Sequence, residues 1–239
     1  MSLNKILVAT NLTERSERAL ARALQLKSDA LILLHVVPAG LPPELAAEQQ
    51  KAAETFLAHR LRYEGSERAS DRSHNVLTGS AFSTIIAEAI SSAAELIVIG
   101  KPGTRPFSEL FTGTTAERVI RFSDRPVLMV KKPESGPSRR VLVGRKRQCV
   151  RFEWLWQLHL MRSSVSSTRG GHLMCHSAIS KRHRRQDNPY IVVANQSSWA
   201  DLLAMGTHSK GLLASTVSIG KLARHLLIEA SCDVLTSRP

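Results

Sequence analysis

Short apolar runs and amphipathic stretches alternate along the first half of the chain. The apolar runs have the length and composition of strands buried on both faces, and residues 96–99 form the most apolar of them. Between the runs, apolar residues recur every three or four positions, which is typical of helices with one buried face. The pattern predicts strands at residues 5–9, 30–37, 73–78, 96–99 and 126–130. It predicts helices at residues 14–27, 42–62, 81–94 and 114–122, the first of them capped by Thr13.

Strands that alternate with helices pair in parallel, because each crossover returns the chain to the same edge of the sheet. We therefore expect an α/β fold, a five-stranded parallel sheet with helices on both faces. In such sheets, ligands bind at the carboxyl ends of the strands, near the point where the strand order reverses. Two loops are placed for this role, residues 9–11 after the first strand and the residues from 100 onward after the fourth.

The same pattern begins again after a linker with Pro and Gly, predicted at residues 134–138. The matching segments are 139–143 with 5–9, 200–206 with 94–100, 217–229 with 114–122, and 232–235 with 125–128. We predict two copies of one domain, at residues 1–133 and 139–239, of which the second is incomplete by roughly one helix and one strand. Its strands at 202–205 and 234–235 are expected to pair against the first domain.

The loop after the fourth predicted strand contains three glycines with different physical roles. Gly100 ends the strand where the backbone approaches a ligand closely, and Gly103 permits a turn with positive φ. Gly113, with Thr114 and Thr115, begins a helix whose free N–H groups and dipole favour an anion. This arrangement predicts a phosphate-binding loop. The alternative is three turn glycines in a tightly connected α/β domain.

Five motifs resemble the universal stress protein family and follow its order along the chain. They are Leu7-Val8-Ala9-Thr10-Asn11, His35-Val36-Val37, Ile97-Val98-Ile99-Gly100 with Gly103, Gly113-Thr114-Thr115-Ala116-Glu117-Arg118-Val119, and Arg125-Pro126-Val127-Leu128-Met129-Val130. The resemblance implies a Rossmann-like fold of the adenine nucleotide alpha hydrolase type and a regulatory role in the stress response. It also implies dimerisation through the last strand, as a homodimer or as an internal pseudo-dimer of the two copies.

The resemblance further implies binding of an adenine nucleotide, ATP, together with Mg²⁺. The residues implied to surround adenine and ribose are Ala9, Thr10, Asn11 and Val37. The residues implied to hold the ribose and phosphates are Ile99, Gly100, Gly103, Gly113, Thr114 and Thr115. In the second copy Ser209 replaces the second glycine and Lys221 follows Gly220, so one intact loop is expected rather than two.

Two positions of the first copy depart from the family pattern. Asn11 stands where Asp is usual, and Pro102, which has no N–H, stands where His is frequent. Both departures favour an alternative function, a non-nucleotide interaction protein that works through sheet-edge dimerisation. The intact glycine loop favours the nucleotide.

No catalytic constellation is visible in the sequence. Neither a Ser–His–Asp set nor paired carboxylates emerge, and the glycine loop lacks the Lys of a Walker loop. We therefore expect no catalytic residue and no enzyme activity, with slow ATP hydrolysis as a third option. His35 is expected to be a core-edge histidine, and Arg15 and Ser16 to lie on a helix surface.

The net charge of +13 belongs mainly to one segment. Residues 1–138 carry a net charge of +2 and residues 200–239 a net charge of +1, whereas residues 139–199 carry +10. The distribution of charge therefore does not favour a nucleic-acid partner. No apolar run has the length of a membrane span or of a signal peptide, and the three cysteines show no paired spacing. These features predict a cytoplasmic protein without membrane contact.

Residues 145–199 are anomalous in composition. They hold all three tryptophans and only two acidic residues, and they lack the apolar periodicity of a folded domain. A basic nucleic-acid arm around residues 181–185 is one explanation. A metal site at His172, Cys175 and His176 is another, although this spacing matches no common zinc pattern. The favoured hypothesis is an out-of-frame reading of a GC-rich gene, which would leave the segment disordered.

The out-of-frame hypothesis predicts a specific result at the level of the coding DNA. Translation of the stretch for residues 145–199 in the other two frames is expected to yield the missing strand and helix pattern of the repeat. Sequencing of the gene and its transcript checks this. Two alternative frames without such a pattern would contradict the hypothesis.

Overall fold

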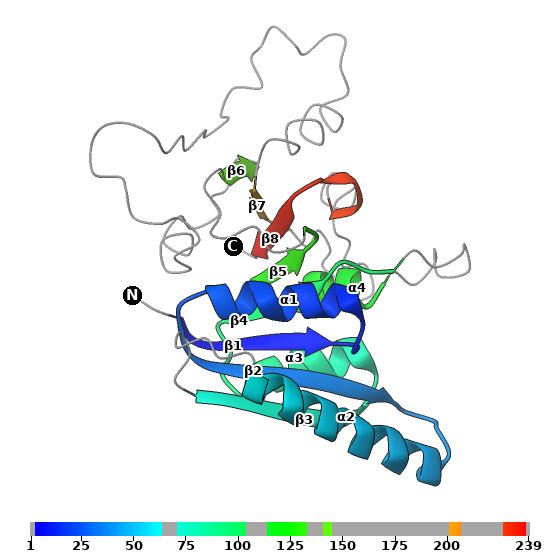
Figure 1. Cartoon of the computed structure of the whole chain (residues 1–239). Coiled ribbons are helices and arrows are strands. Elements are labelled where there is room, and N and C mark those ends of the chain that lie inside the picture. The colour runs from blue at the N-terminus through cyan, green and yellow to red at the C-terminus, as the bar shows by residue number, and fades with distance from the viewer. Residues whose placement is uncertain are drawn as a thin grey trace, which may run out of the picture.

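The computed structural model of the chain describes residues 3–63, 71–103, 114–132, 141–144, 201–206 and 227–237, in which one sheet lies between helices (Figure 1). The strand order is β3-β2-β1-β4-β5-β8-β7-β6. The strands are β1 (Leu3–Thr10), β2 (Ser28–Pro38), β3 (Asp71–Gly79), β4 (Leu96–Gly100), β5 (Val127–Val130), β6 (Val141–Gly144), β7 (Leu202–Gly206) and β8 (Asp233–Ser237). The helices are α1 (Glu14–Gln25), α2 (Pro43–Tyr63), α3 (Ala81–Ser91) and α4 (Thr115–Phe122).

The central strands bury side chains on both faces of the sheet. In β1, Val8 packs in one cluster with Leu20 of α1, whereas its neighbour Leu7 packs in a second cluster with Val119 of α4. All four side chains are at most 2% exposed. Alternate residues of a strand face opposite sides, so a continuous apolar run is what a strand covered by helices on both faces requires. Each such side chain contributes roughly 1.5–3 kcal/mol through burial.

The first five strands confirm the predicted fold. β1, β2, β3, β4 and β5 pair in parallel, with α1 and α2 contributing to one core cluster and α3 and α4 to the other. Every strand and helix predicted in the first copy is present, with ends shifted by a few residues. None of the described helices has the length and apolarity needed to cross a membrane.

The C-terminal strands extend this sheet beyond β5. β8 pairs antiparallel with β5, with Leu128 opposite Leu235, and β8, β7 and β6 pair in parallel with one another. The expected pairing of residues 234–235 with the first domain is confirmed. Residues 202–205 instead pair with β8 and β6, because β8 lies between them and β5.

Several predictions for the second copy lie outside the described residues. These concern the linker at 134–138, the segment at 145–199, and the degraded loop with Ser209, Gly220 and Lys221. Of the helix predicted at 217–229, only its last three residues are described, and they are helical. The domain boundaries stay predictions.

A buried carboxylate ties β8 to the first domain. The Oδ1 atom of Asp233 accepts hydrogen bonds from the backbone N–H groups of Lys131, at 2.8 Å, and Lys132, at 3.2 Å. Its Oδ2 atom lies 3.5 Å from Nε of Arg22 on α1, and both side chains are less than 10% exposed. Burial raises the pKa of Asp233, while the two N–H groups and the charge of Arg22 oppose that rise.

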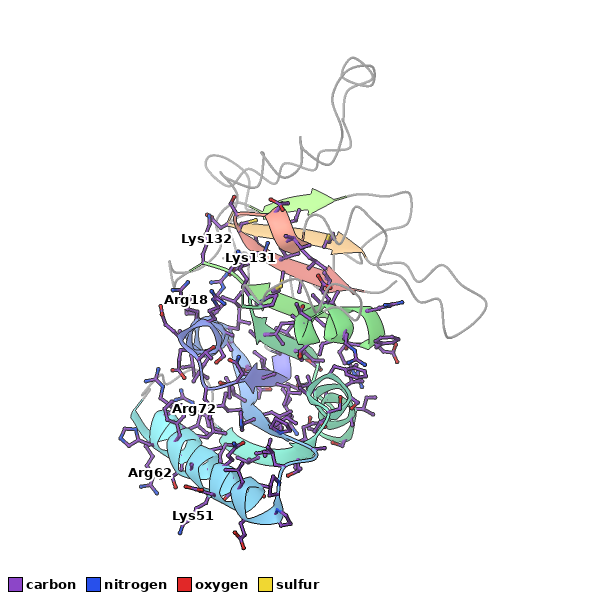
Figure 2. All side chains as sticks on the ribbon, turned by 90° about the vertical axis from the view of Figure 1, so that its right-hand side faces the viewer. Arg18, Lys51, Arg62, Arg72, Lys131 and Lys132 are labelled. Atoms are coloured by element: carbon purple, nitrogen blue, oxygen red, sulfur yellow. The ribbon has the colours of Figure 1, made fainter. Side chains whose placement is uncertain are left out.

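Lys131 makes a second connection from the end of β5 to the C-terminal segment (Figure 2). Its ammonium donates to the carbonyl oxygens of Ala230, at 2.7 Å, and Ile228, at 3.2 Å. These carbonyls end the short helical turn before β8, where a cation is favourable. Burial and the nearby charge of Lys101 lower the pKa of Lys131 to about 8. The ammonium of Lys131 is therefore stabilised by the two carbonyl oxygens but loses hydration on burial.

Replacement of Asp233 tests what holds β8 in place. Asp233→Leu is expected to lower the free energy of unfolding by about 3 kcal/mol, because two backbone N–H groups and Arg22 lose their acceptor. Asp233→Asn keeps an oxygen for the N–H groups. The raised pKa means that the charge itself is disfavoured in the fold, so Asn is expected to cost less than half as much.

Urea unfolding and hydrogen exchange of residues 233–237 measure both variants. Glu229→Gln, which removes a charge from an exposed residue of the same segment, is the control and is expected to change little. Equal losses for Leu and Asn at position 233 would show that the charge, not the acceptor, holds the strand.

Candidate functional site

The strand order reverses between β1 and β4. From β1 the chain proceeds outward through β2 to β3, and from β4 it proceeds in the opposite direction to β5. Because β1 and β4 are parallel and Ala9 pairs with Ile99, Thr10 and Gly100 end at the same edge of the sheet. The loops after β1 and β4 therefore flank the switch point at which parallel sheets bind ligands. This confirms the predicted placement of the two loops.

Hydroxyl groups hold the loop after β1. The Thr10 hydroxyl donates to Oγ of Ser16 at 2.9 Å and accepts from the Leu12 N–H at 3.0 Å. Ser16 Oγ also accepts from the Thr13 N–H, at 3.1 Å, and donates to the Thr13 carbonyl, at 2.8 Å. Leu12 has φ of 60°, a left-handed conformation that these bonds support.

The expectation that Ser16 lies on a helix surface is wrong. Its side chain is buried, with 4% of the residue exposed, because it faces Thr10 across the first turn of α1. Ser16 is the third residue of α1, and its hydroxyl accepts the N–H of the N-cap residue Thr13. A capping arrangement of this kind uses Glu or Gln at the third position more often, so a serine there gives little sequence signal.

Asn11 is exposed at the centre of the same loop. Its Oδ1 atom accepts a hydrogen bond of 2.7 Å from the Thr13 hydroxyl, which orients the carboxamide. The carbonyl oxygen of Thr10 lies 3.0 Å from Nδ1 of the half-buried His35, on the neighbouring strand β2. His35 is thus the core-edge histidine predicted, and it links the ends of β1 and β2.

Gly100 makes room for α1. A Cβ atom at this position would lie 2.6 Å from the carbonyl oxygen of Arg15 and 3.2 Å from the backbone nitrogen of Ser16. The expected close approach at Gly100 is therefore present, but the first turn of α1 occupies the space that the sequence analysis assigned to a ligand. Backbone atoms cannot move aside as a flexible side chain does, so a glycine is required here.

Gly103 makes room for the guanidinium group of Arg15. A Cβ atom here would lie 2.9 Å from Nη1 of Arg15, and the φ of Gly103 is not positive. The predicted positive-φ turn at Gly103 is therefore wrong, and the absence of a side chain serves a contact instead. Arg15 lies exposed on the surface of α1, as expected, and its guanidinium group lies beside this loop.

The helix after the glycine loop begins as predicted. Thr114 is the N-cap of α4, and its hydroxyl accepts the N–H of Glu117 at 3.3 Å. Thr115 is the first residue of the helix and is exposed. Because α4 leads back to the start of β5, its N-terminus lies toward the carboxyl edge of the sheet. Gly113, predicted to precede this cap, lies outside the described residues.

The other predicted contact residues offer mainly backbone atoms. Val37 is fully buried and Ile99 is 5% exposed, so neither side chain reaches solvent to an extent that a ligand could use. Ala9, which pairs with Ile99 in the sheet, is half-buried. The structure thus brings Ala9, Thr10, Asn11, Ile99 and Gly100 to one edge, with Val37 near the end of the adjacent β2.

The donor set of this edge does not suit a protein-bound divalent cation. The loop after β1 offers hydroxyls and a carboxamide but no carboxylate. The two acids in the first turn of α1, Glu14 and Glu17, are paired with Arg18 and Arg60. In the part of the chain that the structure describes, no group of three or more His, Cys, Asp and Glu residues could hold a metal ion.

A shallow hollow of about 560 Å³ lies elsewhere, on α2. Its lining residues are Glu48, Lys51, Ala52, Thr55, Phe56 and His59. All six come from one helix face, and none belongs to the loops after β1 and β4. The switch point, where polar groups of several elements meet, therefore remains the candidate site.

Arg15 is the residue at this edge whose position the sequence analysis missed. A signal for it exists in the sequence, because a cation in the first turn of a helix is disfavoured by the helix dipole. An arginine in the first turn of a helix, after a loop at a predicted binding edge, indicates a role other than helix stability.

Comparisons with known proteins match the first part of the chain to one family. The model of the universal stress protein family matches residues 2–131. A universal stress protein of Methanocaldococcus jannaschii is 27% identical over 157 residues, which cover 55% of this chain and 96% of that protein.

Two solved structures share the fold over nearly the whole chain. A universal stress protein from Archaeoglobus fulgidus has a TM-score of 0.69 and 15% identity, with 100% of this chain and 99% of that chain covered. A functionally unknown protein from Pseudomonas aeruginosa has a TM-score of 0.61 and 20% identity, with 99% and 93% covered.

The two glycines of the loop are expected to differ in their tolerance of a methyl group. Gly100→Ala should lower the free energy of unfolding by about 2–3 kcal/mol, because the new Cβ meets the backbone of α1. Gly103→Ala should cost less than about 1 kcal/mol, because the Cβ meets only the end of a long side chain. Urea unfolding measures both. Similar losses at the two positions would contradict the contacts described.

Proposed function

The chain belongs to the universal stress protein family, and from that premise we propose that it binds an adenine nucleotide, ATP, at the switch point between β1 and β4. Binding would act as a regulatory signal in a stress response. The observation that carries the proposal is the convergence at one sheet edge of the loop around Asn11, the start of the glycine loop at Gly100, and the guanidinium of Arg15.

The chemistry of this edge suits a nucleotide in two parts. The backbone of Ala9 and Val37 and the polar groups of Thr10 and Asn11 are the proposed contacts for adenine and ribose. A buried apolar wall with a few oriented polar groups is the usual composition of such a site. The oriented carboxamide of Asn11 supplies both a donor and an acceptor for a heterocycle or a hydroxyl.

The phosphate side rests on the glycine loop and on α4. The proposed contacts are Ile99, Gly100, Gly103, Gly113, Thr114 and Thr115. Gly103 and Thr114 flank the stretch that lies outside the described residues, and the N-terminus of α4 offers free N–H groups to an anion. The side chain of Thr115 is exposed, so its hydroxyl is accessible to a ligand.

A regulatory role is favoured over catalysis by the residues around the edge. The loop after β1 contains no carboxylate that could act as a general base. Glu14 and Glu17, at the start of α1, are paired with arginines. His35 faces the carbonyl of Thr10 rather than the loop after β4. We accordingly propose that the protein is not an enzyme. We also propose, as the sequence predicts, that it acts in the cytoplasm.

The second candidate function is an interaction protein that uses the edge of the sheet. The β5 edge, through which the family resemblance implies dimerisation, is paired in cis with β8. This favours an internal pseudo-dimer over a homodimer at that edge. It also favours the nucleotide function over one that needs a free β5 edge, because β8 would have to leave first.

Titration of the full-length protein with ATP tests the proposed function. At a hundredfold excess of ATP over its Kd, the free energy of unfolding should rise by about 2.7 kcal/mol, because only the folded state binds. Isothermal calorimetry gives the Kd, and thermal shift follows the stabilisation. Adenosine alone is expected to bind more weakly, since it lacks the phosphates.

Matched asparagine variants locate the effect. Asn11→Ala is expected to weaken ATP binding, whereas Asn75→Ala, two strands away in β3, is expected to leave it unchanged. Absence of heat and of thermal stabilisation with ATP would overturn the nucleotide function and favour the interaction protein.

A further inference from the structure

Arg15 connects the two loops of the candidate site. It is the second residue of α1, in the turn that follows the loop after β1. Its carbonyl lies against the end of β4, at Gly100, while its guanidinium Nη1 lies against Gly103. The backbone of Arg15 is therefore fixed by a contact that a glycine permits, and its side chain extends along the start of the glycine loop. Two separate contacts thus place one positive charge at this edge.

The charge of Arg15 is not neutralised by its acidic neighbours. Glu14 pairs with Arg18 one turn farther along α1, at 2.6 Å, and Glu17 pairs with Arg60 of α2. Of the carboxylates that the structure describes, none forms an ion pair with Arg15. The first turn of α1 therefore presents, beside Gly103, a guanidinium that no described carboxylate pairs with.

The position of this charge is unfavourable for the helix itself. The N-terminus of a helix is the positive end of its dipole, so an arginine in the first turn is destabilising by itself. An anion beside the turn would reverse this, because it interacts favourably with the guanidinium and with the dipole together. The loop after β1, which the structure describes in full, contains no carboxylate that would attract a divalent cation.

We propose that Arg15 binds the phosphates of the nucleotide directly and takes the place of a divalent cation, so that the site accepts a metal-free nucleoside polyphosphate. This inference rests on the proposed nucleotide function and departs from the Mg²⁺ that the family resemblance implies. A guanidinium presents paired N–H donors whose geometry matches two phosphate oxygens, which a lysine does not offer. Asn11, in the loop that precedes α1, is neutral and adds no negative charge to this edge.

The inference predicts that binding is independent of metal and dependent on Arg15. In the full-length protein, the Kd for ATP in the presence of EDTA should agree within about threefold with the Kd in excess Mg²⁺. Arg15→Met, which keeps an apolar stem of similar length, should weaken ATP binding by about ten- to a hundredfold, as expected for loss of charge-assisted hydrogen bonds. The Kd of Arg15→Lys for ATP should lie between those of the wild type and Arg15→Met.

The control is Arg62→Met. Arg62 lies in the last turn of α2, which leads to the start of β3 at the opposite edge of the sheet (Figure 2). The Arg62→Met substitution also removes one positive charge, and it should leave the Kd for ATP unchanged. Adenosine binding should also be unchanged in Arg15→Met, since adenosine has no phosphate. Arg15 is exposed, and melting temperatures of all variants verify that they fold.

Each outcome of the calorimetry has a distinct meaning. Binding of ATP by the wild-type chain only when Mg²⁺ is present, or equal affinity of wild type and Arg15→Met, would overturn the role of Arg15 while the nucleotide function stands. Loss of adenosine binding together with ATP binding in Arg15→Met would assign Arg15 a structural role and overturn the inference. No binding of ATP by the wild type under either condition would overturn both proposals.

Discussion

The contact between the first turn of α1 and the end of β4 is the constraint on which the candidate site depends. It brings a helix backbone within the space that any side chain at Gly100 would need. Because the two elements belong to neighbouring strand–loop units on either side of the switch point, their contact sets how far apart the two loops lie. The hydrogen bond between the hydroxyl groups of Thr10 and Ser16 ties the same turn of α1 to the end of β1. Loop geometry at this edge is therefore a consequence of packing in the fold.

Packing and a few hydrogen bonds likewise hold the C-terminal strand β8 on the first domain. β8 continues both core clusters of the first domain, with Leu235 on one face of the sheet and Val234 on the other. Backbone pairing with β5 gives the strand its direction, and Asp233 supplies acceptors for the N–H groups that follow β5. The residue types needed for this are those of an ordinary buried strand with one polar anchor. A segment from far along the chain thus behaves as part of the first domain.

Sequence reasoning was sufficient for the elements of the first domain because their signals are strong and local. Continuous apolar runs such as residues 96–99 and the helical spacing of Ala19, Leu20 and Ala23 have one consistent interpretation, and the structure agrees with it. It was insufficient for Gly100, Gly103 and Ser16. What each of these residues touches depends on Arg15 or Thr10, whose positions follow from tertiary packing and not from local pattern. The strand ends of the site could be predicted, but the partner of each glycine could not.

The antiparallel pairing of β5 and β8 has a consequence for the order in which the chain is made. Lys131 and Asp233 are separated by 102 positions, so the ribosome completes β5 long before β8 exists. At synthesis rates of about 5–20 residues per second, the interval is roughly 5–20 s. Throughout it, β5 is an open edge of a nearly finished sheet, which is a template for other nascent strands. Closure of that edge by β8 has to wait until the C-terminal segment has been made, and the entropic cost of bringing the two strands together grows with their separation along the chain.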